Sequence, residues 1–287
     1  MSRGRLRHAP RLALGQIRYQ LLLLVRNPLG FFLALVVPLL LVLCLNLLTP
    51  GSVTADNGVP YAEFLTPAIG TFCLLNACYV NTITGLVLAR EQGILKRLRG
   101  TPLPMWTYLF GRLGSAFVTG ATALAVLVAV GVAFFGVTID SATIGYVAGV
   151  ASLAMCCFFL LGVAVSTLVP SAETALPVAY GTMLPLAFIS DVFFSSAHAP
   201  QWLHDLASAL PVAPVARAME DTFRPDTHGW PMSGGAMLVM LGWALGSAVT
   251  AALLFRWSPG PWRRDHRAPR WHPRHSATVT ATTPPRP

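Results

Sequence analysis

The sequence is poor in charge, and it lacks the patterns that mark soluble or disulfide-bonded domains. Asp, Glu, Lys and Arg make up only 11% of the 287 residues, whereas roughly a quarter of an average soluble domain is charged. The five cysteines all lie inside apolar runs, and this placement argues against a disulfide framework. These shortages exclude an ordinary soluble domain and predict one integral membrane unit.

Catalytic and nucleotide-binding motifs are missing as well. The chain has a single lysine, Lys96, outside the Gly-Lys-Ser or Gly-Lys-Thr setting of a phosphate-binding loop, so it cannot bind ATP by that motif. His-Glu-x-x-His and Gly-x-Ser-x-Gly are absent, and His198, His204 and Asp205 lack an evident nucleophile. We therefore expect no catalytic residue, no metal site and no cofactor on this chain, which leaves an intramembrane hydrolase as a weak alternative.

Apolar runs are what the sequence has in abundance, with a mean hydropathy of +0.61. Six runs are long enough to cross a bilayer as helices. They lie at residues 29–48, 64–88, 107–135, 143–169, 175–194 and 234–256. In the turn after the fourth run, Pro170 is expected to end one helix, and Ser171 or Thr174 to cap the next. The prediction is an all-α integral membrane protein with six transmembrane helices.

The flanking segments are basic. Residues 1–26 hold six Arg and no acid, and residues 257–287 hold six Arg and one Asp, within a formal net charge of +9. Basic ends on an apolar body indicate contact with an anionic membrane face rather than with nucleic acid. Residues 1–10 are expected to form a basic cytoplasmic N-terminus, 11–26 an amphipathic interfacial helix, and 257–287 a disordered Pro-rich tail. One continuous helix over 11–48 is the alternative to a separate amphipathic helix.

The orientation follows from the same charges. With both termini in the cytoplasm, eighteen of the twenty basic residues lie inside, and only Arg217 and Arg224 lie outside. These two belong to the long outer segment 195–233, where apolar residues repeat at helical spacing before and after Pro211 and Pro214. Two short helices that lie in, or re-enter, the outer interface are predicted there, ahead of the last span.

One concentrated charge cluster, residues 89–103, lies between the second and third runs. Acid stands at its start, base near its end, and Gly and Pro follow, an order typical of a short capped helix from Glu91 to Pro102. Ile94, Leu95 and Leu98 give this helix an apolar side, as expected for docking into a soluble partner. A plain positive-inside anchor would require only the basic residues.

This cluster resembles a motif of ABC-2 type transporter permeases, most closely those of the daunorubicin and doxorubicin resistance type. The residues that carry the resemblance are Glu91, Gly93, Leu95, Arg97, Leu98, Arg99, Thr101 and Pro102. The resemblance extends over residues 11–256, and the Pro-rich segment 211–219 also looks like one that these permeases carry before their last span. It implies an ABC-2 type permease fold, with the cluster touching an ATP-hydrolysing subunit.

The resemblance further implies the partners and the cargo. The chain would be the permease subunit of an ABC exporter in the plasma membrane, paired with a second copy or a paralogue and with a cytoplasmic ATP-binding subunit, and surrounded by membrane lipids. Its substrate would be hydrophobic or amphiphilic, such as a drug, a lipid-like molecule or a natural product. A non-energised channel or scaffold is the main alternative, because hydropathy alone does not require energy coupling.

Polar residues within the second run are candidates for the substrate path. Asn76, Tyr79, Asn81 and Thr84 would lie at membrane depth, where polar side chains face other helices or a cavity. Asn76 and Thr84 are eight residues apart and are expected to share a face. Hydrogen bonds between helices are an equally good interpretation of these residues.

Overall fold

The computed structural model describes residues 61–100, 105–135, 141–190, 201–223 and 229–254, together with the single positions 15, 22 and 40. Every regular element within these ranges is a helix, which confirms the predicted all-α class. The predicted amphipathic helix, the first apolar run and both basic ends fall outside the described residues, apart from those single positions.

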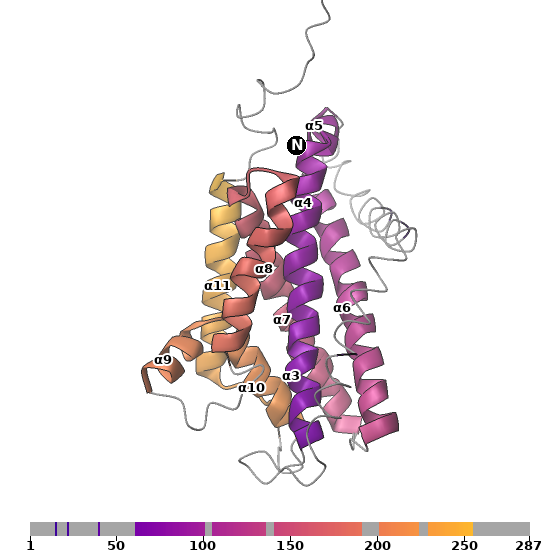
Figure 1. Ribbon diagram of the computed structural model, residues 1–287, viewed down its shortest axis with the longest axis vertical. Coiled ribbons are helices and arrows are strands. Elements are labelled where there is room, and N and C mark those ends of the chain that lie inside the picture. The colour runs from indigo at the N-terminus through magenta and orange to yellow at the C-terminus, as the bar shows by residue number, and fades with distance from the viewer. Residues whose placement is uncertain are drawn as a thin grey trace, which may run out of the picture.

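Five helical stretches in the described residues are long and apolar enough to cross a membrane. They are Thr66–Glu91, Thr107–Ala133, Thr143–Leu168, Ala172–Ile189 and Gly234–Leu254. Each overlaps one of the last five predicted runs, with ends that shift by a few residues. These helices stand side by side as an elongated bundle (Figure 1).

The first of these stretches consists of three consecutive elements. They are α3 (Tyr61–Leu75), a π-helical segment η1 (Asn76–Val80) and α4 (Asn81–Glu91). Within the π-helical segment the amide of Asn81 donates to the carbonyl oxygen of Asn76, five residues back, so the helix holds an extra residue in this turn. Together the three elements form the centre of the bundle, since 72% of the most apolar stretch of this span is buried.

Three further long helices surround this central span. They are α6 (Met105–Phe135), α7 (Ser141–Leu168) and α8 (Ala172–Ile189). Residues 169–171 join α7 to α8, which confirms the helical hairpin expected around Pro170. Ser171 occupies the predicted N-cap position of α8, but its side chain makes no capping bond.

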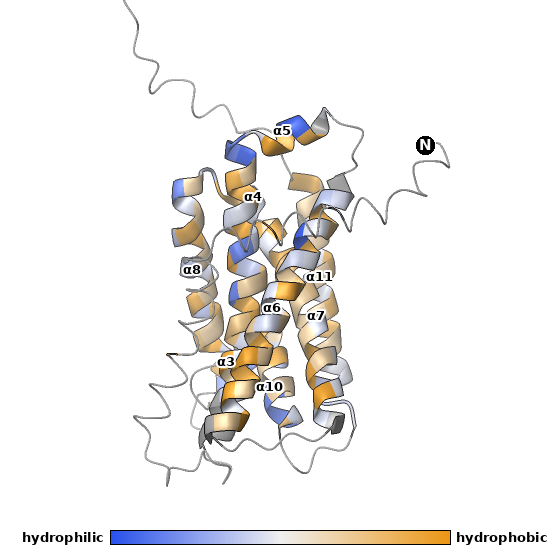
Figure 2. Cartoon of the chain, turned by 90° about the vertical axis from the view of Figure 1, so that its right-hand side faces the viewer, coloured by the Kyte–Doolittle hydropathy of each residue, from blue (hydrophilic) through white to orange (hydrophobic). Residues whose placement is uncertain are grey.

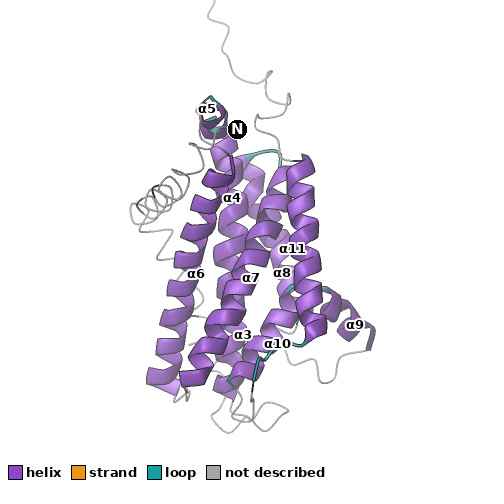
Figure 3. Cartoon of the chain, turned by 180° about the vertical axis from the view of Figure 1, so that it is seen from behind, coloured by secondary structure: helices purple, strands orange, loops and turns teal. Residues whose placement is uncertain are grey.

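The remaining described helices complete the two ends of the bundle. They are α5 (Ile94–Arg99), α9 (Gln201–Ala209), α10 (Val212–Thr222) and α11 (Gly234–Leu254). The two short helices predicted within 195–233 are therefore present as α9 and α10. Opposite views of the chain show α5 and the C-terminal end of α11 at one end, with α9 and α10 toward the other (Figures 1 and 3).

The core lies where the central span meets α7, α8 and α10. Tyr79, Phe158, Met183 and Met219 are among its largest fully buried side chains. The backbones of α7 and the π-helical segment approach each other closely at Gly162 of α7. A Cβ added there would lie 3.0 Å from the Tyr79 carbonyl oxygen. A larger residue at position 162 would therefore push α7 away from the π-helical segment.

Candidate functional site

The charge cluster after the central span folds differently from the single helix predicted over Glu91–Pro102. Glu91 is the last residue of α4, and α5 begins only at Ile94. Gly93 separates the two helices with φ of 70°, a left-handed conformation that glycine adopts without steric penalty. The prediction of one helix did not take account of this glycine, which interrupts the helix before the basic residues.

The short helix α5 has an inward and an outward face. Leu95 is fully buried and Leu98 packs against the core, whereas Ile94 is 39% exposed and Lys96 and Arg97 are exposed. Leu95 therefore anchors α5 to its own bundle, and the prediction that it lies on a docking side is wrong. Hydrophilic residues gather at α5 and the adjoining end of α4, in contrast to the mostly hydrophobic bundle (Figure 2).

The predicted motif continues to the end of α5 and beyond it. Arg99 ends α5, whose C-cap is Gly100. Thr101 and Pro102 lie outside the described residues. Among the motif residues of α5 whose side chains the structure describes, Arg97 is the exposed one, and it stands at the end of the bundle rather than along its sides.

A connection from α4 to the α7–α8 turn was not anticipated from the sequence. Arg90 donates from Nη1 to the carbonyl oxygen of Ser166 at 3.3 Å and from Nη2 to the carbonyl oxygen of Val169. Glu91 accepts a hydrogen bond from the amide of Ala172 through Oε2 at 2.9 Å. We call these three bonds the Arg90–Glu91 bridge.

The bridge matches the electrostatics of helix ends. Carbonyl groups at the C-terminus of α7 carry partial negative charge and attract the guanidinium, whereas free amides at the N-terminus of α8 carry partial positive charge and attract the carboxylate. Adjacent residues of opposite sign at the end of α4 therefore hold both ends of the hairpin turn. Only the fold brings them together, since about eighty residues of sequence separate the partners.

The four predicted path residues separate into two groups. Tyr79 is buried, and its hydroxyl lies 2.7 Å from the Thr182 hydroxyl of α8. Asn81 is exposed, while Asn76 and Thr84 are half-buried. Tyr79 thus joins two helices, whereas the other three lie on an open surface of the central span.

The π-helical segment explains how these three residues come to share that surface. The incompletely buried positions of the span run from Asn76 to Asn81 and then to Thr84, Gly85 and Leu88. A five-residue step fits a π-turn but would rotate off the face of a regular α-helix. We call these five residues the open stripe. π-turns recur at functional sites, which adds weight to this surface as a candidate site.

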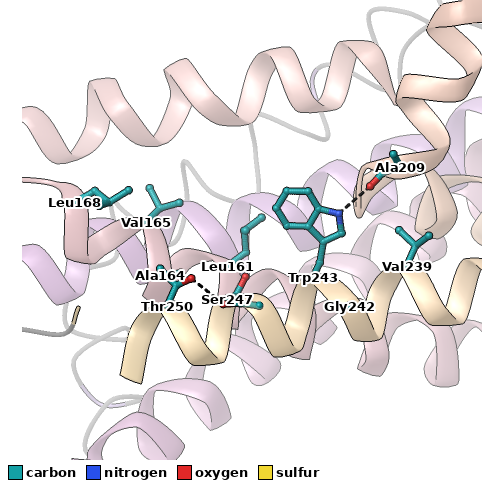
Figure 4. A pocket seen from close by; sticks show the side chains of 11 residues that line it. Leu161, Ala164, Val165, Leu168, Ala209, Val239, Gly242, Trp243, Ser247 and Thr250 are labelled. Atoms are coloured by element: carbon teal, nitrogen blue, oxygen red, sulfur yellow. Dashed lines mark hydrogen bonds between the residues drawn. The ribbon is translucent and has the colours of Figure 1, made fainter. Parts of the chain in front are cut away.

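A separate groove lies between α7 and α11. It has a volume of about 610 Å³ and is lined by apolar side chains such as Leu161, Val165 and Val239. Two of its polar groups are already bonded within the chain, since Trp243 donates to the Ala209 carbonyl oxygen at 2.8 Å and Thr250 donates to the Gly246 carbonyl oxygen (Figure 4). No predicted path residue lines this groove.

The two short helices α9 and α10 differ from each other in burial. α9 exposes Trp202 by 66%, and the Trp243 bond ties the end of this helix to α11. α10 instead inserts into the bundle, with Val215 and Met219 fully buried. α9 therefore keeps an exposed apolar side chain, whereas α10 is packed within the bundle. The association of these helices with the membrane interface stays a prediction.

Comparison with known families gives a direct match. The profile of the family described as ABC-2 type transporter matches residues 16–223, which is well over half of the chain. No match was found among curated proteins. The matched range includes the charge cluster, the open stripe and the Arg90–Glu91 bridge.

Proposed function

Because the chain belongs to the ABC-2 type transporter family, we propose that it is the membrane-spanning permease subunit of an ATP-driven exporter. It is a multi-pass membrane protein and a transporter component rather than an enzyme. Members of this family typically work with an ATPase partner. In this proposal ATP is bound and hydrolysed on a separate ATP-binding subunit, and a second copy or a paralogue of the permease completes the path.

The exposed face of α5 carries the proposal. This helix stands at one end of the bundle, buries Leu95 in its own chain and turns Lys96 and Arg97 outward. Basic side chains on a small, anchored helix suit a docking surface on a soluble partner. We assign α5 the role of the coupling element, and its end of the bundle to the cytoplasmic side of the plasma membrane.

The Arg90–Glu91 bridge supplies a route from α5 into the spans. Displacement of α5 by its partner would pull on the end of α4, to which Gly93 joins it. Arg90 and Glu91 would then carry that displacement to the turn between α7 and α8. Three helices of the bundle would move together at the end where ATP is hydrolysed.

The open stripe is the proposed wall of the path. Polar groups at membrane depth are unfavourable against lipid, so a stripe with Asn76, Asn81 and Thr84 requires a partner surface or cargo. A second permease facing this stripe would enclose a polar-lined path for a hydrophobic or amphiphilic substrate. Tyr79, by contrast, serves to hold the central span against α8.

A site-specific photocrosslink tests the proposal. In a background without native cysteines, a single cysteine replaces Arg97 and carries a maleimide benzophenone, and the matched control places it at Trp202 near the opposite end. Illumination should give an adduct of Arg97→Cys with a protein that contains the Gly-x-x-x-x-Gly-Lys-Ser or Gly-Lys-Thr motif, identified by mass spectrometry. An adduct with such a protein from Trp202→Cys alone, or from neither position, would reject α5 as the docking surface.

A further inference from the structure

Arg112, which the charge count of the sequence places on the cytoplasmic side, lies within a span and beside the open stripe. Arg112 of α6 is half-buried and belongs to the span Thr107–Ala133. It lies five residues, or about 7.5 Å along the helix, after the first residue of that span. Its Nη2 donates to the carbonyl oxygen of Asn81 at 3.0 Å. Asn81 stands ten residues before Glu91, so the guanidinium rests on α4 well inside the span.

Gly85 provides the space for this arrangement. A Cβ at position 85 would lie 2.6 Å from Cζ and 2.9 Å from Nη1 of Arg112, closer than carbon and nitrogen atoms approach without a bond. The guanidinium therefore occupies the space that a side chain at position 85 would fill, and every other residue type would displace it. The clash would involve only the far end of a flexible side chain, so the helices themselves could stay in place.

The charge of Arg112 is not neutralised by the described part of the chain. Its one hydrogen bond there is to Asn81, and it forms no ion pair with a described carboxylate. Arg90, the other cation within the five described spans, is engaged by the carbonyl groups of α7. An ionised side chain at membrane depth without a countercharge indicates a functional site.

We propose that Arg112, with the side chain of Asn81, forms a binding site for the oxyanion of an amphiphile, a carboxylate or a phosphate group. A guanidinium has five N–H donors in a fork that matches such groups, and the Asn81 carbonyl engages one of them. Leu88 is 46% exposed on the same stripe and offers apolar contact for the rest of the molecule. The inference rests on the proposed function, in which this stripe faces the cargo.

Binding to the permease alone tests the site independently of transport. The full chain in phosphatidylcholine nanodiscs is titrated with dodecyl phosphate and with dodecyl maltoside, a neutral amphiphile of the same chain length. Wild type should prefer dodecyl phosphate, and Arg112→Gln should weaken its binding by about ten- to hundredfold, the loss expected for a charge-assisted hydrogen bond. Arg112→Lys keeps the charge without the fork and should fall between them.

A glycine pair provides the matched control. Gly85→Ala should weaken dodecyl phosphate binding because the new methyl group displaces the guanidinium, whereas Gly145→Ala on α7, where an added Cβ meets nothing within 4 Å, should bind as wild type does. Both changes replace a helical glycine with alanine, so helix propensity cannot explain a difference. Wild-type binding by Arg112→Gln or by Gly85→Ala would overturn the site.

Two further arms identify the source of the oxyanion. Phosphatidylglycerol in place of phosphatidylcholine should compete with dodecyl phosphate if a membrane lipid occupies the site, and leave binding unchanged if the site takes cargo. Dodecyl phosphate should stimulate ATP hydrolysis by the complex in the cargo case. Arg112-dependent binding without any ATPase partner would sustain the site and reject the exporter, whereas an active exporter with Arg112-independent binding would reject the site.

Discussion

The short helices α5 and α10 are similar in kind, yet they stand in opposite relation to the bundle. α10 buries eight of its eleven residues, including Val215 and Met219. α5 buries Leu95 and exposes Lys96 and Arg97. The comparison teaches that α10 is part of the core, whereas α5 is anchored to the bundle through Leu95 and keeps Lys96 and Arg97 exposed, as the proposed docking role requires.

Removal of a buried side chain from α10 should give the largest effect, a loss of stability. Met219→Ala should lower the free energy of unfolding by about 2–5 kcal/mol, because a fully buried side chain is replaced by a cavity. Unfolding in mixed micelles, followed by circular dichroism, measures the change. The control Met237→Ala alters a methionine that is 40% exposed on α11, and it should change stability by about 0.5 kcal/mol or less. An equal loss of unfolding free energy in both variants would contradict the structural role of α10.

Disruption of α5 should act on coupling and leave the bundle intact. Leu98→Pro removes a helical amide and clashes with the Ile94 carbonyl, which costs about 3 kcal/mol of helix stability. The variant should insert and unfold as wild type does, while ATP hydrolysis by the purified complex should no longer respond to cargo. Leu98→Ala keeps the helix and is the matched control. A Leu98→Pro complex that responds as wild type does would contradict the contrast between the two helices.

The Arg90–Glu91 bridge gives a smaller and more local effect. Glu91→Ala leaves the Ala172 amide of α8 without its acceptor, a loss of about 0.5–1 kcal/mol for an exposed cap. Hydrogen exchange at that amide should quicken by about two- to fivefold. Glu91→Gln retains an acceptor oxygen and should exchange more slowly than Glu91→Ala. Unchanged exchange in both variants would remove Glu91 from the proposed route.

The smallest expected effect concerns Tyr79. Tyr79→Phe and Thr182→Val each delete one hydroxyl of a 2.7 Å contact, and hydrogen bonds between membrane helices contribute about 0.6 kcal/mol on average. A double-mutant cycle on unfolding in mixed micelles should give a coupling energy of that size. A coupling energy of zero would return Tyr79 to the candidates for the substrate path.

Much of the fold follows from the sequence, because hydropathy reports burial in lipid directly. The last five apolar runs, the hairpin at Pro170 and the two short helices α9 and α10 all have local signals, and the structure contains each of them. The family match likewise agrees with the resemblance carried by the charge cluster. Local periodicity and turn chemistry suffice where an element is defined by its own residues.

The site was less accessible to sequence reasoning, for two physical reasons. Gly93 breaks a pattern that otherwise fits one helix, and that break turns Leu95 from a docking residue into an anchor. The Arg90 contacts with Ser166 and Val169, and the contact of Arg112 with Asn81, join distant segments. Such contacts depend on how the helices pack against one another. The spacing of residues along one helix carries no information about that packing.

The π-helical segment Asn76–Val80 also bears on how relatives of this chain are aligned. Deletion of one residue there would restore an α-helical ladder and leave α3 and α4 in nearly the same relative orientation, because a π-turn holds one more residue than an α-turn over about the same rotation. The same deletion in α3 or α4 would turn the two parts of the span by about 100° relative to each other. A one-residue gap between this chain and a relative therefore belongs within residues 76–80. Placed elsewhere, the gap would pair open-stripe positions of one protein with buried positions of the other.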